Sequence, residues 1–472
     1  MSIALVWFRQ DLRCHDNPAF ATACNQHQFV IPLYIYDEQT LPLTGAQKWW
    51  AHHSLSALDK KLQEYGLRLI LRRGNACELL AQLVNEVDID AVYWNRCYEP
   101  AAIARDKSIK EMLQVQGVNV TSSNGSLLNE PWEIKNKSGD YFKVFTPFWK
   151  HCLQKNSFSQ PIDHHGNPQP FNVPGDRITD WKLLPEKINW AAEFGQYWQP
   201  GEEGAQQKLD AFIRHHLPGY KETRDFPAKD ATSKLSPHLH FGEISPWQIR
   251  RAIDFATLNK NVDLRSAEYF LSELGWREFS YHLLYHFPAL PESNFKTQFD
   301  GFAWNNDADL LTRWQRGLTG FPIVDAGMRE LWRTGYMHNR VRMITASFLI
   351  KDCLIDWRLG AAWFLTTLVD ADLANNSASW QWVAGSGADA APYFRIFNPV
   401  RQSEKFDPDG EYIRRWVAEL AGVSDKWIHQ PWCAPAGELG LTLGEDYPAP
   451  VIDHEKARSL ALMNYQKLKK CG

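Results

Sequence analysis

The sequence contains no pair of cysteines at metal-binding or redox spacing. Its eight cysteines are scattered along the chain, and none forms a CxxC motif. This absence argues against a zinc knuckle, and the scatter argues against the disulfide framework of a small secreted domain. We therefore expect a protein of the reducing cytoplasm, with no metal site.

A strong excess of one charge and a long apolar run are absent too. The formal net charge is −4 over 472 residues, so no global basic field marks a nucleic-acid partner, although a local basic patch is compatible with it. No window has the uninterrupted apolar length needed to cross a bilayer. The N-terminus, MSIALVWFRQDLR, lacks the basic segment, apolar core and cleavage site of a signal peptide. We expect a soluble protein without a membrane partner.

Internal repeats and low-complexity tracts are missing, and 472 residues are enough for two or three domains. The first third alternates compact apolar runs, such as IALVWF at 3–8 and AVYWN at 91–95, with stretches of helical periodicity. This rhythm predicts an α/β domain over residues 1–128, a doubly wound parallel sheet of the Rossmann-like kind. No GxGxxG follows its first strand, so we expect no dinucleotide site there.

The rest of the chain divides into a connector and a helical part. Residues 129–201 are rich in proline, asparagine, glycine and serine and have no strong period, which predicts an interdomain connector over the surface. From residue 202 the pattern is almost purely helical. We therefore predict an all-α second domain over residues 202–472.

Two stretches of the helical part do not read as ordinary amphipathic helices. Residues 366–399, with MHNRVRM at 337–343, combine aspartates, asparagines, a tryptophan pair and a glycine-rich turn. Farther upstream, TSKLS at 232–236 places hydroxyls and backbone N–H groups beside a lysine on a turn just ahead of a helix, as a diphosphate requires. Hydroxyl-rich helix caps are commoner than phosphate sites, so the second pattern is weak alone.

These stretches, together with LSELGWREF, LWRTGYMHNRVRMITASFLIKDCLIDW, LVDADLANNSASWQW and APYFRIFNP, resemble the photolyase and cryptochrome family in order and spacing. The resemblance covers nearly the whole helical domain and implies that it binds FAD. It implies that Arg342 pairs with Asp370 beside the isoalloxazine. It also implies that Asp372 meets the flavin and ribose edge and that Asn376 faces flavin N5. An isolated Arg and Asp would more often form a simple ion pair. The implied cofactor-binding residues are Tyr220, Thr232, Ser233, Lys234, Leu235, Ser236, Phe270, Glu273, Arg277, Asn339, Arg342, Asp370, Asp372 and Asn376.

The resemblance also implies the reaction, which is light-driven repair of cyclobutane pyrimidine dimers in UV-damaged DNA by an electron from excited reduced FAD. The flipped dimer needs aromatic faces and groups that reach its hydrogen-bonding edges. By resemblance Trp276 and Trp382 supply the faces, and Asn339, Met343 and Glu273 contact the bases. A buried Glu273 would have a raised pKa and could share a proton with the dimer. The alternative for Glu273 is a helix cap or a salt bridge to Arg277, four residues on.

Three tryptophans fall at the positions of the family's electron-transfer chain: Trp380, Trp357 and Trp304. Each one alone would be read as a core residue, because tryptophan is highly buried on average. The chain has 21 tryptophans and 13% aromatic residues, and most of these side chains are expected to fill the interior. All three positions match the family together, so we expect them to carry an electron from the surface to the flavin.

DNA contact is expected from a local basic rim, which would bind phosphates without reading sequence in single- or double-stranded DNA. The alternative is that any one of the basic side chains of this rim simply lies on a solvent-exposed surface. The basic side chains of this rim are Arg224, Lys234, Arg340, Arg395, Arg401 and Lys405. The DNA-binding residues implied by the resemblance are Arg224, Trp276, Asn339, Arg340, Arg395 and Gln402. We expect a monomer.

Members of the family often carry a second, light-harvesting chromophore on the α/β domain. Folate-binding bacterial relatives have an Asn-Glu pair after the strand that AVYWN matches, whereas this chain has Ala101 and Ala102. The stretch TGAQKWWAHHSLSALD is similar to the branch of bacterial photolyases nearest to plant cryptochromes, where a folate is held differently. We expect 5,10-methenyltetrahydrofolate, with a flavin or a deazaflavin as alternatives.

Three other functions share this fold and flavin, because fold does not fix function. They are a blue-light signalling cryptochrome, a (6-4) photolyase, and a flavoprotein that binds DNA without repairing it. Asn376, and Asn339 with Met343, argue against the first, and we expect no long disordered C-terminal extension that could act as an output tail. Asn339 and Met343 stand where the (6-4) relatives have histidines. Glu273 does not distinguish repair from DNA binding alone.

Overall fold

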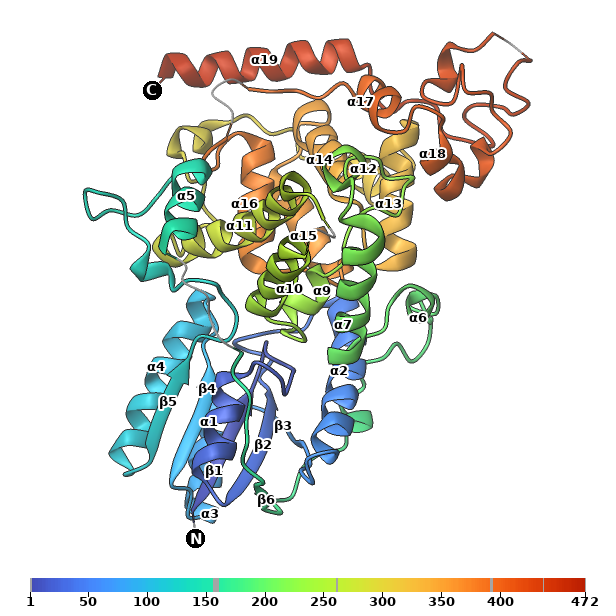
Figure 1. The fold of residues 1–472 in the computed structure, drawn as a ribbon. Helices are drawn as coiled ribbons and strands as arrows, with labels where there is room; N and C mark the ends of the chain where they lie inside the picture. The colour runs from blue at the N-terminus through green and yellow to red at the C-terminus, as the bar shows by residue number, and fades with distance from the viewer. Residues whose placement is uncertain (1, 156–160, 260–261, 391–393, 436, 472) are drawn as a thin grey trace. The chain divides into compact units, whose positions relative to one another are not determined.

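The computed structural model describes residues 2–155, 161–259, 262–390, 394–435 and 437–471 (Figure 1). Contacts within the chain divide it into two compact units. Unit 1 comprises Met1–Pro218 and Ser233–Pro288, and unit 2 comprises Gly219–Thr232 and Ala289–Gly472. None of the helices in these ranges is both long and apolar enough to cross a membrane.

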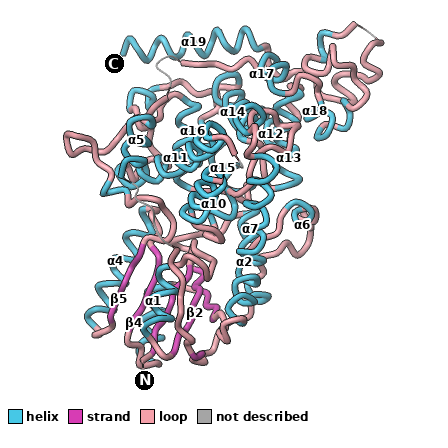
Figure 2. Tube along the Cα trace, in the orientation of Figure 1, coloured by secondary structure: helices cyan, strands magenta, loops and turns pink. Residues whose placement is uncertain are grey.

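Unit 1 contains a parallel sheet with the strand order β3-β2-β1-β4-β5, and β6 pairs with β2 (Figures 1 and 2). In the middle of the sheet, Leu5 of β1 lies opposite Ile31 of β2 and Val92 of β4. Every residue of β1 is buried, as expected for a parallel sheet with helices on both faces. The strands are β1 (Ile3–Phe8), β2 (Phe29–Tyr36), β3 (Ile70–Arg73), β4 (Ala91–Asn95), β5 (Asn119–Ser123) and β6 (Gln169–Pro170).

Helices cover both faces of this sheet. Successive side chains of a strand point to opposite faces. Leu5 of β1 joins Leu80 of α3 and Leu113 of α4 in one hydrophobic cluster. On the other face, the ring of Phe8 lies 6.0 Å from that of Phe20 in α1. The predicted α/β domain with a doubly wound parallel sheet is therefore confirmed. Its helices are α1 (Pro18–Gln26), α2 (Gly45–Gln63), α3 (Ala76–Glu86) and α4 (Pro100–Val115).

The predicted connector contains a helix that the sequence interpretation did not include. Helix α5 (Phe145–Lys155) buries Phe148, Trp149 and Cys152, which are spaced as one face of a helix. A side chain at Gly275 of α11 would come within 2.6 Å of the Trp149 ring, so this glycine permits the close packing of α11 on α5. Other short elements of the segment are η1 (Pro131–Glu133), η2 (Ile178–Trp181) and α6 (Phe194–Tyr197).

Long helices complete unit 1, and the contacts of α11 explain why this unit reaches Pro288. The backbone N–H groups of Leu128 and Asn129 donate to the Glu278 carboxylate of α11 at 2.8 and 3.1 Å. The contact-based division therefore differs from the sequence-based borders at 128 and 201. The remaining helices of unit 1 are α7 (Glu202–Ala211), continued by η3 (Phe212–His216), α9 (Ser236–His240), α10 (Pro246–Leu258) and α11 (Leu264–His286).

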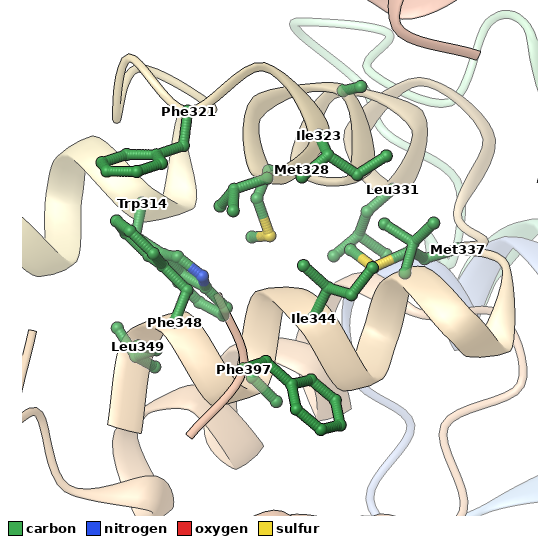
Figure 3. Close-up of a cluster of buried hydrophobic side chains, with 14 of the residues drawn as sticks. Trp314, Phe321, Ile323, Met328, Leu331, Met337, Ile344, Phe348, Leu349 and Phe397 are labelled. Atoms are coloured by element: carbon green, nitrogen blue, oxygen red, sulfur yellow. The ribbon is translucent and has the colours of Figure 1, made fainter. Parts of the chain in front are cut away.

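Unit 2 is helical and is built around one large hydrophobic cluster, part of which is drawn in Figure 3. After residue 201, the regular elements of the described chain are helices, apart from an isolated bridge between Leu443 and Tyr447. The helical nature of this part is confirmed. Its helices are α8 (Tyr220–Thr223), η4 (Thr297–Gly301), α12 (Ala308–Gln315), α13 (Pro322–Thr334), α14 (Asn339–Ser347), η5 (Phe348–Asp352), α15 (Trp357–Thr367), α16 (Leu373–Ala384), α17 (Pro399–Phe406), α18 (Glu411–Trp416), η6 (Ala418–Leu420), η7 (Pro431–Cys433) and α19 (His454–Cys471).

Candidate functional site

The pair formed by Arg342 and Asp370 lies in unit 2. Arg342 is on α14, and Asp370 is in the turn between α15 and α16. The Nη2 atom of Arg342 is 2.9 Å from Oδ2 of Asp370, and its Nε donates to the carbonyl of Met337 at 2.7 Å. Burial lowers the pKa of Arg342, but the charge and hydrogen bond of Asp370, together with Tyr336 and Glu330, outweigh burial, so this pKa lies above its ordinary value. The predicted ion pair therefore exists and keeps the guanidinium charged.

The start of α16 carries two more of the predicted flavin residues. Asp372 is the N-cap of α16 and accepts a hydrogen bond from the backbone N–H of Asn375 at 2.8 Å. One turn on, the side-chain amide of Asn376 donates to the carbonyl of Ala361 at 3.1 Å. This bond uses one of the two N–H donors of Asn376 within the fold, so the amide oxygen and the second N–H are the groups that this side chain can offer to a ligand.

The residues predicted for the diphosphate are divided between the two units. Tyr220, the first residue of α8, and Thr232 belong to unit 2, whereas Ser233 to Ser236 belong to unit 1. Lys234 has a φ of 51°, which is the left-handed region, and the N–H of Leu235 donates to Oγ of Ser233 at 3.4 Å. Ser236 is the first residue of α9. The structure thus has a hydroxyl-rich turn ahead of a helix, as the sequence predicts.

Four predicted site residues lie along α11 in unit 1. Phe270 and Arg277 are buried, Glu273 is half-buried, and Trp276 is 36% exposed. The indole of Trp276 stacks on the ring of Phe145 from α5, with centroids 3.8 Å apart and planes at 9°. Arg277 donates to the carbonyl of Ser126 at 2.8 Å. The helix therefore presents a carboxylate and an immobilised aromatic side chain one turn apart.

Sequence reasoning missed a buried carboxyl group on α11, that of Glu278. Glu278 is 4% exposed and accepts the two backbone hydrogen bonds from Leu128 and Asn129. Burial raises the pKa of Glu278 to about 7. Its position next to Arg277 was the only signal in the sequence, and burial cannot be read from that. This carboxyl group holds the chain after β5 on α11.

The predicted lesion contacts of unit 2 lie on two helices that pack together, α14 and α16. Asn339 begins α14 and is exposed, and Met343 follows one turn later, half-buried. Trp382 is half-buried on α16. These same helices carry Arg342 and Asn376. The structure therefore brings flavin-side and lesion-side residues of the prediction together on one pair of helices.

The three tryptophans of the predicted electron chain share one hydrophobic cluster of unit 2. Trp357 and Trp380 are buried in its core, and Trp304 packs against it half-buried. Gly360 lets α15 approach α16, because a Cβ at this position would lie 2.2 Å from the Trp380 ring. The Nε1 atom of Trp357 donates to Asn294 at 3.0 Å. All three tryptophans thus lie in the same helical unit, the outermost at its edge.

Only some of the side chains in the predicted basic rim are exposed. Arg340 lies 2.9 Å from Asp225, and Arg224 lies 3.9 Å from the same aspartate. A phosphate would have to compete with this carboxylate. Arg395, Arg401 and Lys405 are exposed, and Gln402 is half-buried on α17; Lys234 is half-buried. Residues 391–393 of the motif APYFRIFNP lie outside the described residues. Within the described ranges, no three His, Cys, Asp or Glu side chains are placed to hold a metal ion.

Comparisons with known proteins agree with this geometry. Residues 4–170 match the family model described as DNA photolyase, and residues 270–467 match the FAD binding domain of DNA photolyase. The deoxyribodipyrimidine photo-lyase of Agrobacterium fabrum is 50% identical over 99% of this chain and 98% of its own length. Cryptochrome-2 of Arabidopsis thaliana is 36% identical over 97% of this chain and 77% of its own length. The crystal structure of a bacterial class III photolyase from Agrobacterium tumefaciens superimposes with a TM-score of 0.97 and 50% identity, covering 100% of this chain and 98% of that one. The chain belongs to the photolyase and cryptochrome family.

Proposed function

We propose that this protein is a deoxyribodipyrimidine photo-lyase, which repairs cyclobutane pyrimidine dimers in UV-damaged DNA with light. The observation that carries the proposal is the joint placement of two residue sets on α14 and α16. These packed helices hold Arg342 and Asn376 on the flavin side and Asn339, Met343 and Trp382 on the lesion side. Short electron transfer from flavin to dimer requires the two sites to be neighbours.

The donor set of unit 2 suits FAD. When bound, FAD supplies the light-excited electron donor. The Arg342–Asp370 pair places a fixed positive charge and a carboxylate at one edge of the site. The amide oxygen of Asn376 accepts a hydrogen bond, which is what the N5–H of a reduced flavin needs. Outside unit 2, on the turn that leads into α9, Ser233, Lys234 and Ser236 are proposed to offer hydroxyl groups and a positive charge to the diphosphate.

The lesion contacts are proposed from the chemistry that an unstacked pair of bases needs. Trp276 and Trp382 are proposed to offer aromatic faces, and Phe145 supports the Trp276 indole by stacking on it. Asn339 is exposed at the first position of α14, where its amide can donate to and accept from base edges. Met343 adds a flexible apolar contact. Glu273 would contact the dimer from α11.

DNA binding is proposed to be independent of sequence. The exposed cations Arg395, Arg401 and Lys405 would contact phosphates, together with Gln402 on α17. Arg224 and Arg340 would also contact phosphates, once a phosphate has partly displaced the Asp225 carboxylate from them. Contacts of this kind position a duplex or a single strand without reading its bases. We also propose that the protein acts as a monomer in the cytoplasm.

Trp380, Trp357 and Trp304 are proposed to pass electrons from the surface to the flavin when it is oxidised. Indole is readily oxidised and can then lose its N–H proton. The gradient in burial, from the buried Trp380 and Trp357 to the half-buried Trp304, supports a path that ends at solvent.

An antenna chromophore is proposed on α2. The default ligand site of a doubly wound sheet is the crevice where the strand order reverses, here beside the carboxyl ends of β1 and β4. Arg9 fills this place: it lies 4.4 Å from the Trp7 ring and 2.7 Å from Asp106. On α2, the Nδ1 atom of His52 is buried and has no hydrogen-bond partner among the described residues. We propose methenyltetrahydrofolate there. A second flavin per chain beyond the one FAD, or a deazaflavin, extracted from purified protein would contradict this choice.

Lesion choice tests the proposed function. Two oligonucleotides, one with a cyclobutane thymine dimer and one with a (6-4) photoproduct, are incubated with anaerobically reduced holoprotein in blue light and in darkness. We expect light-dependent repair of the cyclobutane substrate alone. Repair of the (6-4) substrate, or no repair by protein that holds reduced FAD, would contradict the proposal, and the second outcome would favour a signalling cryptochrome.

A further inference from the structure

A cavity of about 520 Å³ opens in unit 2 next to Trp304. Its walls come from the loop that carries Trp304, from the end of η5, and from α19. The apolar part includes Trp304, Leu310 and Leu460, and the polar part includes Asp352, Lys456 and Asn464. The volume falls within the range of small-molecule sites, roughly 300–1,000 Å³. None of these residues has a role in the flavin or lesion contacts described above.

A buried carboxylate lines this cavity with one oxygen unused. Asp352 is 4% exposed. Its Oδ1 atom lies 2.7 Å from Nδ1 of His454, whereas its Oδ2 atom is buried and has no hydrogen-bond partner in the described part of the chain. The neighbouring Lys351 donates elsewhere, to the carbonyl of Arg395 at 2.9 Å. A buried acceptor without a partner is unfavourable, so a ligand with an N–H group would relieve this cost.

The indole of Trp304 is held in place at the cavity wall. On one side, the N–H of Asn305 donates to the carbonyl of Leu354 at 2.7 Å. On the other side, the side chain of Asn464 donates to the carbonyl of Ala303 at 3.3 Å. The ring of Phe302 lies 4.5 Å from the Trp304 ring. These hydrogen bonds fix the backbone on both sides of Trp304. The indole of Trp304 therefore does not have to move when a molecule binds in the cavity.

We propose that this cavity binds a small, planar nitrogen heterocycle that acts as a reductant, with an N–H edge at Asp352 and its ring beside Trp304 and Leu460. The carboxylate oxygen selects an N–H donor, and the apolar lining with the Trp304 indole favours a ring. The electron-donating role rests on the proposed tryptophan chain, but the binding does not. Such a site would supply electrons where the chain meets solvent.

The redox step balances in electrons and protons. After Trp304 has given one electron inward, its radical cation loses the indole N–H proton to solvent. The bound reductant then gives Trp304 one electron and one proton, so an N–H bond of the reductant breaks and the indole N–H bond forms again. The reductant leaves as a one-electron-oxidised radical. Two such radicals disproportionate to one oxidised and one reduced molecule.

Binding in the dark tests the site without any electron transfer. The probe is 6,7-dimethylpterin, the oxidised form of 6,7-dimethyltetrahydropterin, measured by equilibrium dialysis against the holoprotein. We expect one saturable site per chain. Asp352→Asn should weaken binding about tenfold or more, because a hydrogen bond to a charged group contributes about 1.5–3 kcal/mol. Ala457→Phe, which fills the cavity from α19, should abolish binding, whereas the matched Ser459→Phe, exposed on the same helix outside the cavity, should not.

Photoreduction of the oxidised holoprotein with 6,7-dimethyltetrahydropterin tests the role in electron supply. The rate should saturate with pterin concentration in the wild type and in Ser459→Phe, but rise linearly in Ala457→Phe. Trp304→Phe should lose photoreduction while keeping dark binding, so failure of the electron chain is distinct from failure of the site. The proposal is overturned if the wild type shows no saturable binding, or if Asp352→Asn and Ala457→Phe both bind as the wild type does.

Discussion

The ring of Phe145 lies flat on the indole of Trp276, with 3.8 Å between centroids and 9° between planes. Phe145 belongs to α5 and Trp276 to α11, and both helices are part of unit 1. Trp276 remains 36% exposed. A stacked support of this kind fixes the plane that a flipped base would meet.

Loss of this support should weaken DNA binding more than it affects the flavin. Aromatic pairs contribute about 0.5–1.5 kcal/mol beyond their buried area. We expect Phe145→Ala to raise the Kd for dimer-containing DNA about twofold to tenfold, with FAD content unchanged. Fluorescence anisotropy with a dimer oligonucleotide measures this. The matched control is Phe255→Ala on α10, where the side chain is 69% exposed. Equal affinities of Phe145→Ala and the control would contradict the supporting role.

Removal of Arg342 should empty the flavin site. Arg342→Ala removes a cation from the carboxylate of Asp370, whose side chain is 3% exposed. Breaking a buried pair in this way costs about 3–5 kcal/mol. We expect a large loss of bound FAD, read as the ratio of flavin to protein absorbance, and a lower Tm.

The control is an exposed ion pair of similar geometry. Arg313 and Asp309 on α12 are 2.9 Å apart, and their side chains are 48% and 74% exposed. Arg313→Ala should change stability by about 0.5 kcal/mol or less. Full FAD content in Arg342→Ala would show that the pair is structural only.

Photoreduction should depend on each member of the tryptophan chain. Trp380→Phe is expected to block reduction of oxidised FAD by light, because phenylalanine is much harder to oxidise than indole. Repair by chemically reduced protein should be nearly intact. Trp427→Phe, in unit 2 but outside the chain, is the control. Photoreduction of Trp380→Phe at the wild-type rate would exclude this path.

Stability should fall with pH because of Glu278. Burial raises its pKa from 4.5 to about 7 in the folded state. The folded protein therefore binds more protons than the unfolded chain between these values, and the free energy of unfolding falls as pH rises through this window. The full effect is about 3 kcal/mol, since one pKa unit corresponds to about 1.4 kcal/mol.

The comparison variant is Glu278→Gln, which can still accept hydrogen bonds from Leu128 and Asn129. Urea unfolding at a series of pH values should show that the wild type loses stability relative to this variant between pH 4.5 and 7. Parallel curves for the two proteins would mean that Glu278 has an ordinary pKa.

Strands with strong apolar runs could be predicted from the sequence, and weaker elements could not. β1 has the sequence IALVWF and is buried throughout, so its burial could be predicted from its apolar composition. β5 reads NVTSS at the edge of the sheet, where half-exposed positions accept polar residues, and no apolar run marks it. Helix α5 is short and contains a proline. For this reason its apolar face was not recognised in a segment that otherwise resembles a loop.

The site shows the same division between local and long-range information. Arg342 and Asp370 are 28 residues apart, and no periodicity links them; the pairing came from the family pattern and is present in the structure. The stack of Trp276 on Phe145 and the burial of Glu278 depend on packing between distant segments. The contact of Arg340 with Asp225 also depends on packing between distant segments. It offsets one positive charge of the predicted basic rim.

The most direct measurement of the central claim is dimer opening after single flashes of blue light. Reduced holoprotein is mixed with an oligonucleotide that holds one cyclobutane thymine dimer, and the recovery of thymine absorbance is followed per flash and in darkness. We expect stepwise recovery with each flash, none in darkness, and a much smaller step in Asn339→Ala that still holds its FAD. Flash-independent absorbance from fully reduced, DNA-bound protein would contradict it.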